Sequence, residues 1–242
     1  MSDYSSPSVP VVELDSISFC WPRQPAAVVQ IDRLELGAGQ RLFIEGPSGS
    51  GKSTLLSLLA GVTVPQQGTV RILETSLDRL RRSQRDRFRA DHIGYIFQMF
   101  NLIPYLSVLD NVLLPCRFST LRRQRTLRQA TSLDQEAQRL LARLDIDDSL
   151  LDRPVTALSV GQQQRVAAAR ALIGMPELLI ADEPTSSLDR DRQQVFVELL
   201  FEECQRSDSA LVLVSHDTTL AGRFDRTIRL AEINRAARPT TG

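Results

Sequence analysis

One nine-residue stretch, GPSGSGKST at residues 46–54, constrains the fold of this chain more than any other feature, because it matches the pattern G-x-x-x-x-G-K-[ST]. The apolar run RLFIEG leads into it, and STLLSLLAGV, with apolar residues at helical spacing, overlaps its end and continues beyond it. A strand, a glycine-rich turn and a helix N-terminus in this order direct backbone N–H groups at an anion. The pattern therefore predicts a phosphate-binding loop within an α/β fold.

The residue types in this loop suit phosphate chemistry. Gly49 and Gly51 permit the unusual dihedral angles and the close approach that the loop requires. Lys52 is expected to reach the β- and γ-phosphates, and the Ser53 hydroxyl to ligate Mg²⁺. Lys52 is also the only lysine among 29 basic residues, which indicates a site where arginine cannot replace a compact ammonium group. The predicted nucleotide contacts of the loop are Gly46, Pro47, Ser48, Gly49, Ser50, Gly51, Lys52, Ser53 and Thr54.

Two acidic residues follow a second apolar run. The segment LLIADE places Asp182 and Glu183 at the end of a continuous apolar stretch, which is typical of a buried parallel strand. Asp182 is predicted to hold Mg²⁺ through water, and Glu183 to face the water that attacks the γ-phosphate. The alternative interpretation is that two acids end this strand by chance.

Composition argues against several other classes of protein. The chain has 242 residues, of which 42% are hydrophobic, enough for one large domain or two small lobes. It has no run of 18 apolar residues, and its N-terminus lacks the pattern of a signal peptide. Because 29 acidic residues balance 29 basic ones, a protein that coats nucleic acid is not expected. Three widely spaced cysteines favour reduced thiols in a cytosolic protein over a disulfide framework or a zinc cluster.

The order of these patterns predicts one domain with an inserted lobe. Residues 11–98 and 161–231 are expected to form the α/β core, which begins with short alternating runs typical of antiparallel strands. About residues 99–160 are expected to form the helical insertion. Residues 1–10 are expected to be disordered and residues 232–242 to form a loose tail. The charged stretch LDRLRRSQRDRFRAD is interpreted as a solvated helix face, with a nucleic-acid patch as the alternative.

Five motifs in a fixed order give the chain a family resemblance. GPSGSGKST, the glutamine of YIFQ, LSVGQQQRVAAARAL, LLIADEPTSSLD and LVSHD resemble, in this order, the ATPase subunit of ABC transporters over about residues 11–231. The resemblance implies a single P-loop NTPase domain of ABC type, with an N-terminal antiparallel β subdomain and an inserted helical subdomain. The segment HIGYIFQMFNLIPYLSVLDNVLLP is most similar to the lipoprotein-release and macrolide-exporter group (LolD/MacB-like).

The resemblance also implies a dimer. In this family two ATPase domains pair head to tail, and a Ser-x-Gly-Gln segment of one closes over the nucleotide held by the other. That role falls here on Ser159, Gly161 and Gln162, since a hydroxyl, a backbone N–H and a helix N-terminus suit a γ-phosphate. Val160 stands where the family usually has glycine; it is expected to be harmless in a β-like backbone and to forbid a positive φ.

The same resemblance assigns further residues. Trp21 falls where the family has an aromatic residue that stacks on adenine, and the alternative is a half-buried Trp at a strand end. Gln98 resembles the residue that touches Mg²⁺ and the attacking water, and His216 resembles the histidine that contacts the γ-phosphate. Ser187 stands where the group often has Asn, while Asp189 is retained in a loop along the dimer seam and is predicted to bind the nucleotide. The predicted catalytic residues are Lys52, Gln98, Glu183 and His216, and the predicted metal ligands are Ser53, Gln98 and Asp182.

The same resemblance also implies the ligands, the partners and the cellular location of the chain. The resemblance implies ATP and Mg²⁺, a second ATPase subunit in a homodimer, and a transmembrane permease in a separate chain that docks near Gln98 and residues 99–114. It places the chain in the cytoplasm on the inner face of the membrane, without nucleic acid or direct contact with cargo. Such complexes export or extract lipoproteins, lipids, peptides or drugs. The alternatives are an ATPase that regulates cell division or envelope remodelling through a membrane partner, and a soluble ABC ATPase acting on DNA or ribosomes.

Overall fold

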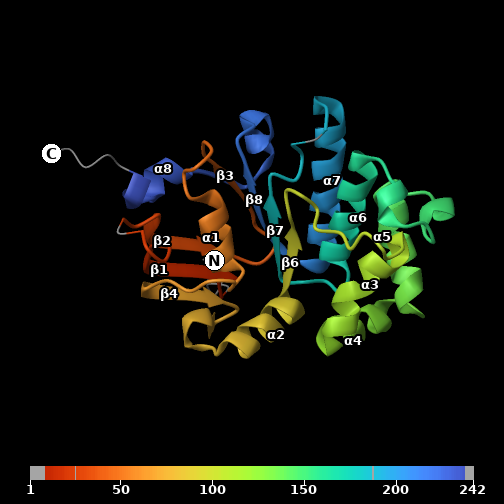
Figure 1. Ribbon diagram of the computed structural model, residues 1–242, viewed down its shortest axis with the longest axis horizontal. Coiled ribbons are helices and arrows are strands. Elements are labelled where there is room, and N and C mark those ends of the chain that lie inside the picture. The colour runs from red at the N-terminus through yellow and green to blue at the C-terminus, as the bar shows by residue number, and fades with distance from the viewer. Residues whose placement is uncertain (1–8, 25, 187, 238–242) are drawn as a thin grey trace, which may run out of the picture.

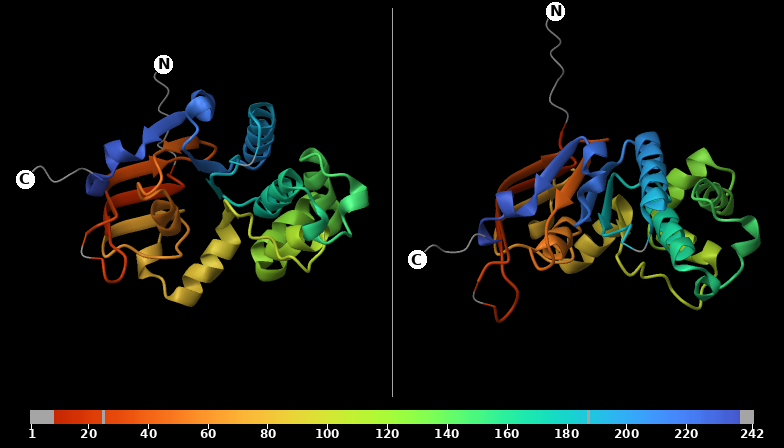
Figure 2. Two further views of the ribbon diagram at one scale, coloured as in Figure 1. Left: turned by 45° about the horizontal axis from the view of Figure 1, so that its top comes forward. Right: turned by 90° about the horizontal axis from the view of Figure 1, so that it is seen from above.

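The computed structural model of the chain describes residues 9–24, 26–186 and 188–237 (Figure 1). The predicted disorder of residues 1–8, the predicted tail from residue 238 onward, and Ser187 lie outside the described residues. Figure 2 shows an antiparallel sheet at one end of the molecule, a parallel sheet in the middle and a group of helices at the other end. Within the described ranges, no helix is both long and apolar enough to cross a membrane.

Four strands within residues 12–76 form the predicted antiparallel sheet, in the order β2-β1-β4-β5. Leu14 pairs with Leu34 on one side and with Val70 on the other. These side chains are buried while their neighbours along the strand alternate outward, as in a sheet with one face on the core. The strands are β1 (Val12–Phe19), β2 (Val29–Leu36), β4 (Gln67–Ile72) and β5 (Thr75–Ser76).

The central sheet is parallel and has the order β6-β7-β8-β3-β9. Its strands are β3 (Arg41–Glu45), β6 (Ile93–Ile96), β7 (Leu178–Asp182), β8 (Ala210–Ser215) and β9 (Arg226–Arg229). Every residue of β8 is buried, which explains its continuous apolar sequence. Because all carboxyl ends of parallel strands lie at one edge, the segments that follow β3, β6, β7 and β8 converge there, which is where ligands bind in such sheets.

Helices cover the parallel sheet and form the lobe beside it. Helix α2 buries none of its residues, as a solvated helix face would. Helices α3, α4 and α5 pack against one another, and α3 and α5 also pack against α6. Their core is continuous with one face of the parallel sheet, since a single cluster contains Val112, Leu140, Phe43 and Leu213. The longer helices are α1 (Lys52–Leu59), α2 (Arg82–His92), α3 (Val108–Phe118), α4 (Thr120–Gln129), α5 (Leu133–Arg143), α6 (Val160–Leu172) and α7 (Arg190–Ser207).

The end of the chain corrects the expectation of a loose tail. After β9, a short helix α8 spans Leu230–Ile233, and a 3-10 turn spans Arg235–Ala237. Leu230 and Asn234 are both fully buried, and α8 packs against β2 (Figure 1). The expected loose tail is therefore wrong for residues 232–237. The physical reason is that an apolar residue and an amide anchor this segment to the sheet, a role that its polar composition does not reveal.

Candidate functional site

The glycine-rich loop connects β3 to α1 and depends on two glycines with positive φ. Gly49 has a φ of 80°, and Gly51, the N-cap of α1, has a φ of 98°, a region that L-residues rarely occupy. A Cβ atom at Gly51 would also lie 3.0 Å from the carbonyl oxygen of Val28. The loop therefore opens at the N-terminus of a helix, where backbone N–H groups favour an anion.

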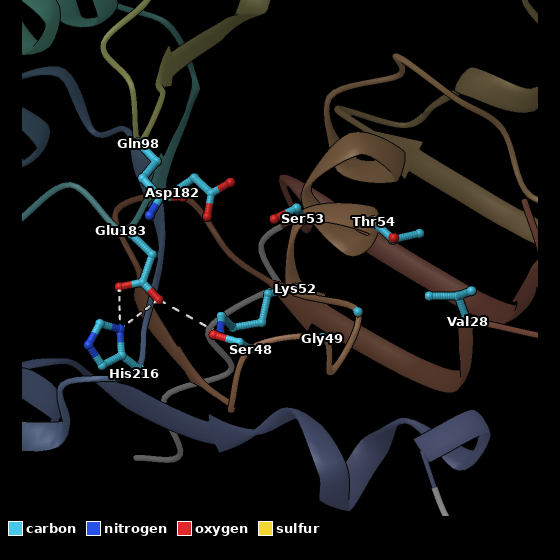
Figure 3. A pocket seen from close by; sticks show the side chains of 11 residues that line it. Val28, Ser48, Gly49, Lys52, Ser53, Thr54, Gln98, Asp182, Glu183 and His216 are labelled. Atoms are coloured by element: carbon cyan, nitrogen blue, oxygen red, sulfur yellow. Dashed lines mark hydrogen bonds and ion pairs between the residues drawn. The ribbon is translucent and has the colours of Figure 1, made fainter. Parts of the chain in front are cut away.

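A cavity of about 350 Å³ lies beside this loop and brings together most of the predicted site (Figure 3). Four separate segments contribute to it: the loop, the residues after β6, the residues after β7 and the residues after β8. Val28 also contributes, and no sequence pattern pointed to it. The lining residues are Val28, Ser48, Gly49, Gly51, Lys52, Ser53, Thr54, Gln98, Asp182, Glu183 and His216.

The ammonium group of Lys52 lies between the loop and the acidic end of β7. Only 8% of the residue is exposed. Its Nζ donates hydrogen bonds to the carbonyl oxygens of Gly46 and Pro47, the latter at 3.0 Å, and lies 3.7 Å from Oε1 of Glu183. A buried cation is thus held next to the cavity by groups that can also release it to a stronger acceptor such as a phosphate.

Glu183 is held by contacts of both its backbone and its carboxylate. Its backbone N–H donates to the carbonyl of Val214 at 2.9 Å, and its φ of 47° is unusual for a residue other than glycine. The Ser215 hydroxyl donates to Oε2 at 3.1 Å, and His216 Nδ1 lies 2.9 and 3.0 Å from the two carboxylate oxygens. Ser215 was not predicted, although its place next to His216 at the end of β8 was a usable signal.

Oxygen ligands suitable for a small divalent cation lie beside Glu183 in the same cavity. The Asp182 carboxylate is turned towards Ser53 (Figure 3). Burial raises the pKa of Asp182, and the nearby Ser53 hydroxyl opposes that rise. Within the described part of the chain, no three His, Cys, Asp or Glu side chains lie close enough to hold a metal. This small set of oxygen ligands suits Mg²⁺, which keeps waters and phosphate oxygens as further ligands.

The predicted signature residues do not belong to this cavity. Ser159 caps the N-terminus of α6, where its hydroxyl accepts from Gln162 N at 3.3 Å and its own N–H donates to Oε1 of Gln162 at 2.9 Å. Neither of them, nor Gly161, is among the described residues that line the cavity. Val160 is the first residue of α6 and lies in the right-handed helical region rather than a β-like one, so it replaces glycine without strain.

Trp21 and Asp189 also lie outside the cavity lining. The Trp21 indole N–H donates to Oγ1 of Thr54 at 3.2 Å, and the ring contacts Phe19 edge to face at 5.0 Å. Because Thr54 lines the cavity, Trp21 lies next to the site with 39% of its surface exposed. Asp189 caps α7 by accepting from the N–H of Arg192 at 3.0 Å. In the described structure, Asp189 therefore acts as the N-cap of α7.

Comparisons with known proteins agree with this geometry. The ABC transporter family profile matches residues 29–186. The lipoprotein-releasing system ATP-binding protein LolD of Hydrogenovibrio crunogenus is 40% identical over 200 residues, which cover 82% of this chain and 83% of that protein. The uncharacterized ABC transporter ATP-binding protein YbbA of Escherichia coli K12 is 41% identical over 194 residues, covering 79% and 81%.

A solved structure shares both the fold and part of the sequence. The ATP-binding cassette MJ0796, in a dimeric post-hydrolysis state bound to ADP and phosphate, matches with a TM-score of 0.80 and 31% identity. The match covers 93% of this chain and 95% of that one. The family profile spans well over half of the chain. The phosphate loop of the chain, Asp182, Glu183 and His216 line one cavity. The chain therefore belongs to the ABC transporter family, of which it forms an ATP-binding domain.

Proposed function

We propose that this chain hydrolyses ATP as a head-to-tail dimer and drives a separate membrane permease. One observation supports this most strongly. The phosphate loop, the acids and His216 line one cavity, whereas Ser159, Gly161 and Gln162 sit at a helix N-terminus outside it. A γ-phosphate bound in the cavity can be enclosed by such a helix N-terminus only if a second copy supplies it. The similar cassette MJ0796 is dimeric.

The geometry supports a specific division of labour during hydrolysis. The loop N–H groups and Lys52 bind the β- and γ-phosphates, and Lys52 neutralises the leaving ADP. Glu183 accepts a proton from the attacking water, whose oxygen bonds to the γ-phosphorus as the bond to the bridging oxygen breaks. His216, which lies against both carboxylate oxygens, keeps this base in position. Bound at Ser53, Asp182 and Gln98, Mg²⁺ would neutralise phosphate charge.

A second groove supports the proposal of a permease partner. It has a volume of about 370 Å³ and lies along β6, between α2, α3 and α6. Its walls are mainly apolar and include Tyr95, Phe97, Leu114 and Phe118. Phe97 stacks on Tyr95, with ring centroids 4.1 Å apart, and precedes Gln98 in the chain. A partner helix in this groove would therefore touch the residue next to the ATP site.

Binding to a permease would determine where the chain lies in the cell and which kind of transport it drives. An ATPase bound to a permease lies on the cytoplasmic face of the membrane. The similarity to LolD favours release or export of lipoproteins among the possible cargoes, which also include lipids, peptides and drugs. The cargo itself would contact the permease and not this chain.

Capture from membranes tests the groove. A tagged Glu183→Gln chain is incubated with detergent-solubilised membranes of its own cells and Mg·ATP, and co-purifying proteins are identified by mass spectrometry. We expect a transmembrane permease, and we expect it to be lost with the added change Phe118→Asp, because Phe118 is 78% exposed in the groove and a carboxylate there would have to be desolvated.

The matched control is Leu127→Asp, an exposed apolar position on α4 that does not line the groove. It is expected to retain the permease. Equal retention by both variants would contradict the groove as the docking site. Recovery of ribosomal or DNA-bound proteins with no membrane protein would contradict the permease itself.

A further inference from the structure

The segment that follows β9 returns to the phosphate loop and is joined to it by one side chain. Asn234 is fully buried although it lies only eight residues from the end of the chain. Its Nδ2 donates to the carbonyl oxygens of Val28 at 2.9 Å and of Ser50 at 3.3 Å. Its Oδ1 accepts from the backbone N–H groups of Gln30 at 2.8 Å and Ala236 at 3.2 Å.

The chemistry of these four contacts requires an amide. Two donors meet two carbonyl oxygens, and two lone pairs meet two N–H groups, so every hydrogen-bonding position of the Asn234 side chain is used. A flipped amide would place oxygen against oxygen and N–H against N–H. An aspartate could accept from Gln30 and Ala236 but could not donate to Val28 or Ser50.

The Ser50 carbonyl and the Gly51 N–H belong to one peptide unit. The described chain has no cis peptide bonds, and in a planar trans peptide the C=O and N–H point in opposite directions. When Asn234 holds the carbonyl of Ser50, the N–H of Gly51 is therefore directed away from Asn234. Gly51 is the N-cap of α1 and lines the cavity, so this N–H belongs to the set that faces a phosphate.

The surroundings of Gly51 allow this peptide little freedom. A Cβ atom at Gly51 would lie 3.0 Å from the Val28 carbonyl oxygen and 3.5 Å from Nδ2 of Asn234. The same two groups are joined to each other by a hydrogen bond. Val28 and Asn234 thus lie close against Gly51, whereas a Cβ atom at Gly49 would meet nothing within 4 Å.

We propose that Asn234 is a positioning residue for the phosphate loop, which fixes the Ser50–Gly51 peptide in the orientation that binds the nucleotide phosphates. It does not line the cavity and acts through the loop rather than on the nucleotide. This inference rests on the proposed binding of ATP. Residues 230–237, which lie outside the phosphate-loop motif, would thus help to shape the phosphate loop.

The test uses Asn234→Asp, which keeps both acceptors and removes both donors. The fluorescence of Trp21, the only tryptophan in the chain and a neighbour of Thr54, reports the Kd for ATP. We expect the Kd and the KM for ATP to rise about five- to tenfold, with kcat changed less than about twofold, since the groups that touch the reacting atoms remain in place. Asn234→Ser, a milder change that retains one donor, is expected to lie between wild type and Asn234→Asp.

The matched control is Asn111→Asp in the helical lobe. Asn111 is also fully buried, and its amide also donates to backbone carbonyls, those of Ile103, Leu106 and Ser107. It is expected to lose a similar amount of thermal stability but to keep the wild-type Kd for ATP. An unchanged Kd in Asn234→Asp, or an equal rise in both variants, would overturn the positioning role. Absence of ATP binding in the wild type would instead contradict the proposed function.

Discussion

Replacing Glu183 with Gln is expected to lower the rate of ATP hydrolysis by about 100-fold or more while the Kd for ATP changes less than about threefold. The amide has the same shape as the carboxylate and can still accept from Ser215, so the cavity keeps its form. It cannot accept a proton from water at neutral pH, however, and loses the role of general base. Phosphate release measures the first effect, and Trp21 fluorescence measures the second.

The control for this change is Glu198→Gln. Glu198 is an exposed acid on α7 that pairs with Arg223 and lies outside the cavity. Glu198→Gln removes the same charge as Glu183→Gln. We expect its rate of hydrolysis to stay within about twofold of wild type, since exposed ion pairs contribute little to stability. Hydrolysis by Glu183→Gln at the wild-type rate would show that another group activates the water.

Replacing Lys52 with Ala is expected to raise the Kd for ATP about 10- to 100-fold, which corresponds to the loss of charged hydrogen bonds to phosphate. Hydrolysis is expected to fall below detection, because the leaving ADP then lacks its nearest cation. Truncation also removes the contacts of the ammonium group with the carbonyls of Gly46 and Pro47. Titration of Trp21 fluorescence with Mg·ATP measures the affinity.

Lys52→Arg separates charge from shape at the same position. The planar guanidinium is larger than the ammonium group, and only 8% of Lys52 is exposed, so the retained charge is not expected to restore hydrolysis. Wild-type turnover in Lys52→Ala would contradict the assignment of the phosphate loop.

The parts of the fold that the sequence predicted well are those governed by local chemistry. Glycines with positive φ, a lysine and a helix start mark the loop at residues 46–54, and the continuous apolar sequence of β8 marks a buried parallel strand. Because parallel strands end at one edge, Gln98, Glu183 and His216 could be expected to meet. The structure places all three on one cavity.

The parts that escaped prediction depend on contacts distant in sequence. Asn234 bonds to Val28 and Gln30, more than 200 residues earlier in the chain, and a polar tail gives no local sign of such partners. The helical insertion expected over about residues 99–160 is divided into several helices, because Ser119 and Ser132 begin new helices there by accepting backbone N–H groups. Val160 was expected to be harmless in a β-like backbone; it is instead the first residue of α6, where its φ is not positive.

Light scattering decides whether two copies of the chain build each ATP site. The Glu183→Gln chain is expected to have the mass of one chain without nucleotide and of two chains with saturating Mg·ATP, because ATP joins the halves and is not hydrolysed. Adding Ser159→Arg places a large cation at the exposed start of α6 and is expected to keep the chain monomeric while Trp21 still reports bound ATP. A Glu183→Gln chain that binds ATP yet stays monomeric would contradict the head-to-tail dimer.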